Sequence, residues 1–339
     1  MIDLLNKLCS LNGTSGREEK IREFIISQIQ GKCEYSVDPL GNIIAFKKGE
    51  KAPKGRIMLD AHMDEVGFII TGITDDGFLK FATVGGIDEK VIVGRECVVG
   101  DKEINGVFGI KPIHLVDKED ELTAPKKDDL YIDIGANSKK EAEEYVSPGD
   151  SAYFKGDFTA LGSGFIKAKA LDDRAGCLIL INLINSALEY DTYFTFTVQE
   201  EVGLRGAGAA CYAVKPDYAL IIETTTAADV SGIEGCDRVC VPGDGPVISF
   251  MDGATVYDRE MFSLAFDVAK NSGIKCQAKT RVAGGNNAGA VHKSLCGIRT
   301  LALSLPCRYL HSPSCVISES DLYESEKLVR EMIKALAEK

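Results

Sequence analysis

Two changes of character along the chain limit its possible fold more than any single motif. Residues 1–66 and 161–339 alternate helical stripes with short apolar strands, as βα units do. Residues 67–160 instead carry short apolar segments separated by turn signals such as Asn105-Gly106. The sequence therefore predicts an α/β domain built from both ends of the chain, with a small β-barrel domain inserted at residues 67–160.

Hydrophobic periodicity and turn residues predict the elements of both parts. Ser15 and Glu18 have the spacing of a capping box, which predicts a helix over residues 16–30. The charged stretch SKKEAEEY, residues 138–145, predicts one helix in the insertion. The remaining expected elements are strands over residues 43–46, 56–60, 192–198 and 218–223 and helices over residues 173–187, 257–271 and 322–338.

Composition and charge exclude several classes of protein. With 339 residues and 45% hydrophobic composition, the chain can bury a large core, and its net charge of -12 argues against binding to nucleic acid or an anionic membrane. It has no apolar run of about 20 residues and no signal-peptide pattern at its start, so we expect a cytoplasmic protein. Its eleven cysteines are scattered, and we expect reduced, mostly buried thiols, Cys296 among them.

The segment DAHMDEVG, residues 60–67, places a histidine and an aspartate where an apolar strand ends. Side chains alternate along an extended backbone, so His62 and Asp64 project to the same side. A histidine that ligates a metal usually donates its second ring N–H to a carboxylate, and Asp64 is placed to accept it. A surface hydrogen bond would also explain the pair, so this segment alone does not decide for a metal.

Four further segments place carboxylates or a histidine at strand ends and turns, where open α/β sheets build their sites. Asp172 is the first of two aspartates before a predicted helix, which an N-cap would also explain. Glu200 and Glu201 follow an apolar strand and, being adjacent, point in different directions, so one can bind a metal while the other faces the substrate. Glu223 ends another predicted strand, and His311 lies between two prolines in PCRYLHSP.

Taken singly, each of these groups is explained as a cap or a surface pair. Gathered in one place, unpaired carboxylates would be strongly unfavourable without a cation. Oxygen ligands together with two imidazoles suit zinc, cobalt or manganese, and a carboxylate between two ions suits a two-metal hydrolase. His114 lies in the insertion and His292 in an apparent helix, so we expect structural roles for both.

The motifs resemble those of the tetrahedral (TET) aminopeptidases, a family of cytosolic di-metal enzymes that includes glutamyl aminopeptidases and proteins once labelled as cellulases. The resemblance implies a mixed-sheet α/β fold of the zinc-exopeptidase type and an aminopeptidase that acts on short peptides. It covers almost the whole chain, through SGxE (residues 15–18), DxLGN (38–42), DAHMDEVG (60–67), KALDDRAG (169–176), QEEVGLRGA (199–207), GGNNAGAVH (284–292) and PCRYLHSP (306–313).

Carried over position by position, the resemblance implies a role for each candidate residue. Asp172 would bridge two divalent ions, zinc, cobalt or manganese. Asp64 would orient His62, and Glu200 would be the general base that takes a proton from the metal-held water and returns it to the leaving amine. The remaining ligands would be His62 and Glu223 on one ion and Glu201 and His311 on the other.

Two positions depart from the family pattern. The family commonly has aspartate where Glu223 stands, and we expect a shifted backbone to take up the extra methylene. The loop usually written GGTDAG reads GGNNAG here, so Asn287 replaces a carboxylate that we expect near the substrate cleft. The insertion matches the family's dimerisation domain, which implies dimers that assemble into a hollow tetrahedral dodecamer.

Other functions stay open at this point. A related hydrolase would use the same residues on N-acylated amino acids or blocked peptides, and a non-catalytic peptide-binding assembly protein would keep the fold. Competent side chains at every ligand position and at the base argue against the latter. A cellulase has little support, because glycosidases use two carboxylates and need no histidine-bound metal. The sequence indicates neither the preferred N-terminal residue nor the metal.

Overall fold

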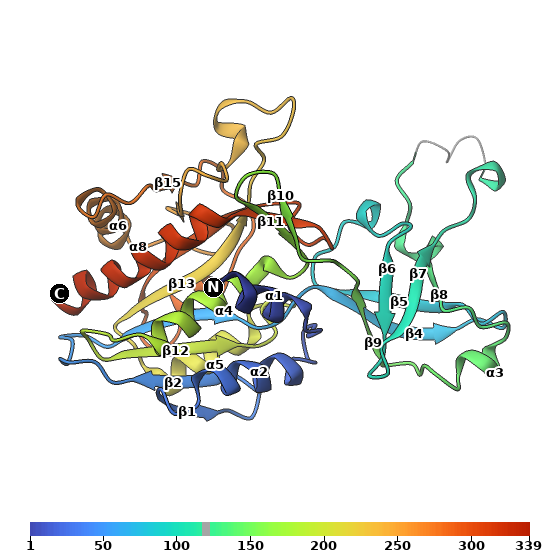
Figure 1. The fold of residues 1–339 in the computed structure, drawn as a ribbon, viewed down its shortest axis with the longest axis horizontal. Helices are drawn as coiled ribbons and strands as arrows, with labels where there is room; N and C mark the ends of the chain where they lie inside the picture. Colours follow the sequence, from blue (N-terminus) through green and yellow to red (C-terminus); the bar gives the residue numbers. More distant parts are fainter. Residues whose placement is uncertain (117–122) are drawn as a thin grey trace.

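The computed structural model describes residues 1–116 and 123–339, which form an α/β body and a closed β-barrel (Figure 1). The body contains a mixed sheet of eleven strands in the order β1-β2-β12-β3-β13-β16-β17-β11-β10, with β14 and β15 added beside β16. The central neighbours β12, β3, β13 and β16 run parallel, whereas β2 and β17 are antiparallel to theirs. The predicted mixed-sheet α/β fold is confirmed. Its strands are β1 Glu34–Val37, β2 Ile43–Lys47, β3 Ile57–His62, β10 Thr159–Leu161, β11 Phe165–Ala168, β12 Thr192–Thr197, β13 Tyr218–Thr226, β14 Val247–Ile248, β15 Gln277–Ala278, β16 Arg299–Arg308 and β17 Cys315–Ser318.

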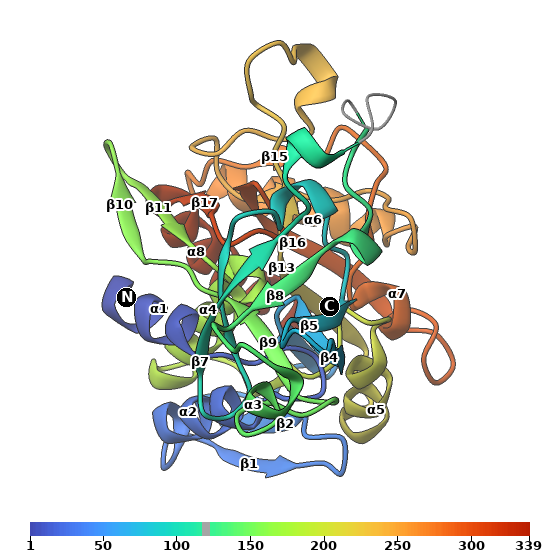
Figure 2. The same ribbon diagram turned by 90° about the vertical axis from the view of Figure 1, so that its right-hand side faces the viewer.

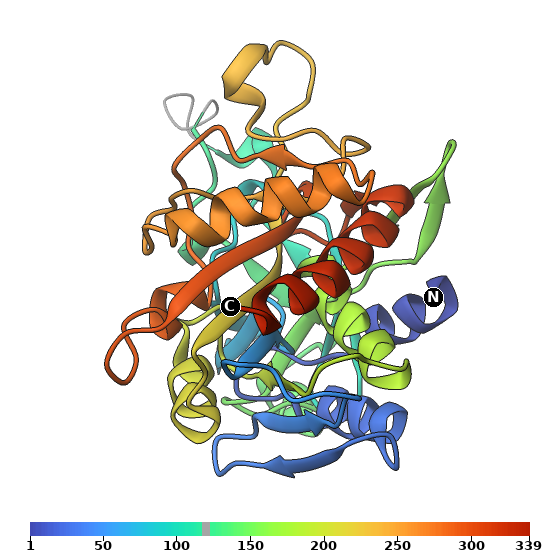
Figure 3. The same cartoon turned by 90° about the vertical axis from the view of Figure 1, so that its left-hand side faces the viewer.

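Helices cover both faces of the central sheet. Every residue of β3 is therefore buried. Helix α4 packs on β3 and β13 and contacts α1, α2 and α8, whereas α5 packs on β12 and β2 and contacts α7. Helices α6 and α8 lie side by side next to β16 (Figure 3). The helices of the body are α1 Ile2–Ser10, α2 Glu19–Ile29, α4 Leu171–Asn185, α5 Arg205–Val214, α6 Arg259–Asn271, α7 Ala288–Val291 and α8 Glu319–Ala337.

The barrel closes in the order β4-β5-β8-β7-β6-β9, and its strands lie between Gly67 and Phe154 (Figure 2). It has a separate core, in which the ring centroid of Phe68 lies 5.2, 4.5 and 5.0 Å from those of Phe81, Phe108 and Phe154. The predicted barrel is confirmed, while the exact domain boundaries stay a prediction. Its elements are β4 Gly67–Ile73, β5 Leu79–Val84, β6 Glu96–Val99, β7 Ile104–Gly109, β8 Tyr131–Asp133, α3 Lys139–Ala142 and β9 Ser151–Phe154.

The chain enters the barrel at Gly67, the last residue of DAHMDEVG, where a side chain does not fit. A Cβ atom there would lie 2.8 Å from Thr14 Oγ1 and 3.0 Å from the carbonyl oxygen of Ala152. Glycine therefore allows the N-terminal loop to pack directly against the first barrel strand.

Two predictions about local structure are wrong. Helix α2 begins at Glu19, and Ser15 does not cap it: its hydroxyl donates to Asp64 Oδ2 at 2.6 Å. Strand β13 does not end at Glu223 but continues to Thr226, because its ladder with β16 extends as far as Thr226 and Cys307. Both errors have one cause. The residue that bonds to Ser15, and the strand that pairs with the end of β13, lie far away in the sequence.

The exposure of the cysteines and the apolar character of the helices relate to the expectation of a cytoplasmic protein. All eleven cysteines are free and most are buried, but Cys296 is exposed, contrary to expectation. In the part of the chain that the structure describes, no helix combines the length and the apolar character that crossing a bilayer requires.

Candidate metal centre

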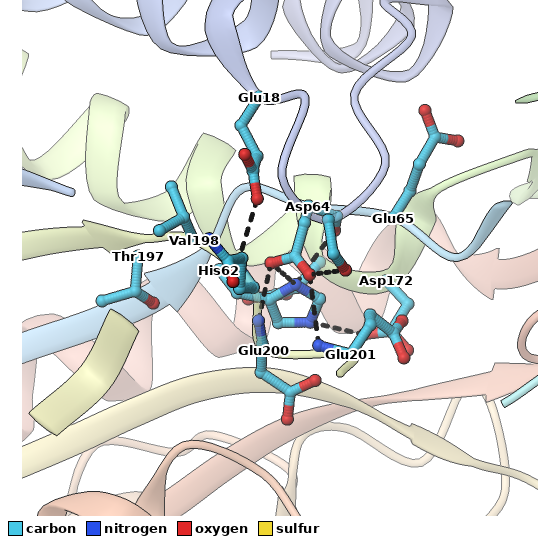
Figure 4. Close-up of polar contacts among 12 residues, drawn as sticks. Glu18, His62, Asp64, Glu65, Asp172, Thr197, Val198, Glu200 and Glu201 are labelled. Carbon is cyan, nitrogen blue, oxygen red and sulfur yellow. Dashed lines mark hydrogen bonds and ion pairs between the residues drawn. The ribbon is translucent and has the colours of Figure 1, made fainter. Parts of the chain in front are cut away.

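The candidate residues meet where the central strands end, although they come from distant parts of the sequence. Figure 4 shows four of them, His62, Asp172, Glu200 and Glu201. His62 is the last residue of β3, and the turn with Glu200 and Glu201 follows the neighbouring strand β12. Glu223 lies in β13, just beyond the point where its pairing with β3 stops at Ile221. The other two candidates are Asp172, which precedes the helical part of α4, and His311, in the turn between β16 and β17.

Two groups of three side chains share Asp172. On one side, His62 Nε2 lies 3.3 Å from Asp172 Oδ1 and 3.4 Å from Glu223 Oε1. On the other, His311 Nε2 lies 3.2 Å from Asp172 Oδ2 and 3.4 Å from Glu201 Oε2. Ligand atoms around a tetrahedral zinc ion with bonds of 2.0–2.2 Å lie about 3.3–3.6 Å apart. In each group the histidine thus lies at ligand spacing from two carboxylate oxygens, and Asp172 offers a different oxygen to each histidine. His62, Asp172 and Glu201 also place ligand atoms within 4.8 Å of one another, so the two groups adjoin.

Asp173 also approaches the centre, since ligand atoms of His62, Asp173 and Glu223 lie within 4.8 Å of one another. Its Oδ1, however, accepts the backbone N–H of Gly176 at 2.9 Å, which is the hydrogen bond of a helix N-cap. The two explanations of the aspartate pair therefore both hold, one for each residue: Asp173 caps α4 and Asp172 faces the centre.

Burial and crowding change the acidity of the carboxylates. Burial raises the pKa of Glu201 and of Glu223 to about 8, and repulsion from Asp172 adds to both shifts. Burial also raises the pKa of Glu200. Among the described residues no lysine or arginine forms an ion pair with these three carboxylates, and Glu201 Oε1 is buried without a hydrogen-bond partner. The centre therefore holds negative charge that protons or cations must neutralise.

Burial acts on the histidines in the opposite sense, but neighbouring carboxylates raise the pKa of both. Burial alone would lower the pKa of His311, but Asp172 and Glu201 outweigh it and raise the pKa to about 10. The pKa of His62 is likewise raised by Glu223 and Asp172 against the effect of burial. Carboxylates and imidazoles in this proportion suit zinc, cobalt or manganese, so the donor set fits a divalent cation.

The second ring nitrogen of each histidine has an acceptor that fixes the ring. His62 Nδ1 lies 3.0 Å from the backbone oxygen of Asp64 and 3.4 Å from its Oδ1. His311 Nδ1 lies 2.6 Å from the carbonyl oxygen of Gly86, in the loop after barrel strand β5. Both rings therefore turn Nε2 toward Asp172. The sequence does not predict this role of Gly86, because the pair Gly85-Gly86 indicates only a turn.

Asp64, which is predicted to orient His62, also accepts two backbone N–H groups. Its Oδ1 accepts the backbone N–H of Glu200 at 3.0 Å, and its Oδ2 accepts that of Glu201 at 3.1 Å. In Figure 4 the carboxylates of Glu200 and Glu201 point to different sides, and that of Glu201 lies toward Asp172. The carboxylate of Glu201 thus belongs to one group of three and that of Glu200 to neither.

A cavity of about 520 Å³ opens beside the centre. It is bounded by the end of β13 at residues 224–226, by the loop residues 283–286 and by both histidines. Glu200 borders it as well, so a substrate in the cavity reaches the candidate ligands and the candidate base together. Further lining residues are Asp88, Val239, Ser249, Asp252, Lys279 and Arg281.

The structure describes the surroundings of both residues that depart from the family pattern, and it contradicts the expectation for Asn287. The ladder of β13 runs in unbroken register through Glu223 and Ser304, and Glu223 Oε1 also accepts the backbone N–H of Thr224 at 3.0 Å. The backbone shift expected at Glu223 stays a prediction. Asn287 does not line the cavity: it is buried and donates at 2.8 Å both to Asp60 Oδ2 and to Thr197 Oγ1. The asparagine therefore takes part in buried hydrogen bonds to Asp60 and Thr197 and does not change the charge of the cavity.

Comparison with known proteins supports the same conclusion. The model of the family described as M42 glutamyl aminopeptidase matches residues 41–328. The chain belongs to the M42 aminopeptidase family. As an M42 aminopeptidase it is a hydrolase, which favours this activity over the alternatives left open by the sequence. M42 aminopeptidases are metal-dependent, in keeping with the donor set described above.

Relatives of this M42 aminopeptidase share nearly its whole length. The TET1 peptidase of Pyrococcus horikoshii, which can assemble into a tetrahedron or a large octahedral shell, is 38% identical, with a TM-score of 0.86 over 98% of each chain. An aminopeptidase of the archaeon Desulfurococcus kamchatkensis is 33% identical, with a TM-score of 0.93 over 98% of this chain and 94% of that one. The lysyl aminopeptidase of Pyrococcus furiosus is 30% identical over 98% of this chain and 97% of its own.

Proposed function

We propose that this M42 aminopeptidase hydrolyses the N-terminal peptide bond of short peptides with two divalent cations and Glu200 as general base. The observation that carries the proposal is the shared position of Asp172, whose two oxygens lie 3.3 and 3.2 Å from the Nε2 atoms of His62 and His311. His62, Asp172 and Glu223 would hold one ion, and His311, Asp172 and Glu201 the other. Bound there, the ions would make water more acidic and polarise the scissile carbonyl.

Glu200 is suited to proton transfer because its carboxylate is free of both groups of ligands and borders the cavity. It would accept the proton of the attacking water and deliver it to the leaving amine. Asp64 would keep the Glu200–Glu201 turn in place through the two backbone N–H groups that its carboxylate accepts. Zinc, cobalt and manganese all suit these ligands.

The assembly and location of the enzyme are further parts of the proposal. The P. horikoshii TET1 peptidase can assemble into a tetrahedron, and its 38% identity supports a similar assembly here. We propose that the barrel mediates dimers and that these form a tetrahedral dodecamer, which would restrict substrates to short peptides. Eleven free cysteines are in keeping with a reducing cytoplasm.

Metal removal tests the central claim. Protein stripped with a chelator should lose activity and regain it as about two equivalents of zinc, cobalt or manganese bind per chain. Metal uptake should release protons and become tighter from about pH 6 to about pH 8, because Glu201 and Glu223 have a pKa of about 8 and His311 one of about 10. Elemental analysis and calorimetric titration at several pH values measure both effects. Chelator-insensitive activity, or uptake that is independent of pH, would contradict the proposal.

Lys279 supports a preference for acidic N-terminal residues. Its side chain lines the cavity and is only 8% exposed. Its ammonium group donates to the carbonyl of Ala283 at 2.8 Å, and in the described part of the chain no other acceptor is bound to it, so N–H bonds remain for a ligand. Asp252 nearby is already satisfied by the N–H groups of Ala254 and Thr255 and by the hydroxyl of Tyr257.

The substitution Lys279→Met should therefore lower kcat/KM for glutamyl substrates by about 10- to 100-fold, the usual effect of losing a hydrogen bond to a charged group. Leucyl substrates should change by less than about threefold, because they offer no carboxylate. Chromogenic aminoacyl substrates measure both values, and Lys270→Met, an exposed lysine of α6, is the matched control. An equal loss for the two substrates would show that Lys279 does not select acidic residues.

A further inference from the structure

The turn that carries the candidate base is held by carboxylates at three consecutive backbone N–H groups. Those of Glu200 and Glu201 donate to Asp64 at 3.0 and 3.1 Å, and that of Gln199 donates to Glu18 Oε1 at 3.1 Å. Figure 4 shows Glu18 reaching the turn from the N-terminal loop, on the side opposite the Glu200 carboxylate. Two buried acids from separate segments thus hold one short turn.

Both acids are themselves fixed by the N-terminal loop. Glu18 is 3% exposed, and the same Oε1 atom accepts the N–H of Gly16 at 2.8 Å. Gly16 has a φ of +84°, a conformation that glycine adopts readily and that directs its N–H toward Glu18. Ser15 donates to Asp64 Oδ2 at 2.6 Å. The side chains of Ser15 and Glu18 in the SGxE motif therefore support the turn with Glu200, whereas the backbone of Glu18 begins α2 by accepting the N–H of Arg22.

The turn needs such support for two reasons. Gln199 has a φ of +56°, a left-handed conformation that is unfavourable for a residue with a side chain unless its surroundings hold it. Glu201 lies 3.4 Å from His311 within a group of ligands, whereas no hydrogen bond or ion pair among the described residues holds the carboxylate of Glu200. The hydrogen bonds that hold Glu200 in place are therefore those of its backbone.

We propose that Glu18 is a positioning residue for the general base, acting on Glu200 through the backbone N–H of Gln199. This inference rests on the proposed role of Glu200. Glu18 does not line the cavity; it keeps the peptide before Glu200 in the conformation from which the base reaches the attacking water. Because the oxygen of a neutral amide also accepts an N–H, the role requires an acceptor at this point and not a charge.

The test compares Glu18→Ala with Glu18→Gln. Glu18→Ala should lower kcat by about 10- to 100-fold, with KM and metal content unchanged, because a small displacement of the base is costly. Glu18→Gln should stay within about threefold of the parent, since its amide oxygen can accept both N–H groups that Oε1 accepts. Glu19→Ala, an exposed neighbour on α2, is the matched control. If Glu18→Ala does not fold, Glu18→Asp, one methylene too short, should show the loss of kcat.

A double variant separates positioning from a general structural role. In the Glu200→Gln background, Glu18→Ala should change the residual rate by less than about twofold, because the group it positions is already absent. A full kcat in Glu18→Ala, or a loss that persists in that background, would overturn this inference alone if Glu200→Gln itself shows the large loss of kcat expected of a missing base. Full activity of Glu200→Gln would overturn the proposed base together with this inference.

Discussion

Glu200→Gln should lower kcat by about 10²- to 10⁴-fold, the usual contribution of a general acid–base group. Glutamine keeps the size and the backbone N–H that donates to Asp64 at 3.0 Å, so the turn should hold its shape. It cannot accept a proton from water, however. KM and the number of bound ions should therefore stay close to those of the parent enzyme.

Steady-state kinetics with short peptides and elemental analysis of the same preparations measure this result. Glu143→Gln, in an adjacent glutamate pair on the barrel surface, is the control for the chemical change itself. Loss of the ions in Glu200→Gln would mean that Glu200 is a ligand, and undiminished kcat would mean that another group moves the proton.

Asp172→Asn should remove the link between the two ion sites. An amide has one oxygen and one NH₂ group, so it cannot offer an oxygen to both His62 and His311, from which Asp172 now lies 3.3 and 3.2 Å. We expect metal affinity to fall by more than about 100-fold at one site or both, because even indirect partners of ligands contribute 10- to 100-fold. Activity should fall with it.

Asp173→Asn is the matched control, since the neighbouring amide oxygen can still accept the N–H of Gly176 and cap α4. Metal content after dialysis, measured on both variants, decides between the two aspartates. Retention of two ions by Asp172→Asn, or their loss from Asp173→Asn alone, would assign the bridge to Asp173 instead.

The sequence predicts the architecture well because apolar runs report burial directly. The strands ending near His62 and Glu200 and the helix after Asp172 are almost entirely buried. The structure places the two strands among the central strands of the sheet and packs the helix on β3 and β13. The gathering of candidate side chains follows from the shared edge of neighbouring strands. These inferences need only local pattern and the known geometry of α/β sheets.

Long-range partners explain the errors. Ser15 and Glu18 have the spacing of a capping box, but they bond instead to Asp64 and to the turn at Gln199, which lie 49 and 181 residues away. Asn287 belongs to a loop whose neighbours line the cavity, yet its side chain turns beneath the sheet to Asp60. No local pattern carries these pairings, because each depends on how two distant segments dock.

The contact between His311 and Gly86 has a consequence for how such enzymes diverge. The acceptor is a backbone carbonyl, which every residue offers, and a Cβ added at Gly86 would meet the imidazole at 3.6 Å, an ordinary contact distance. Selection on this contact would act on the path and length of the loop after β5 and leave its residues free to change. A graft of another barrel could therefore preserve every recognisable motif and still leave the imidazole free to rotate.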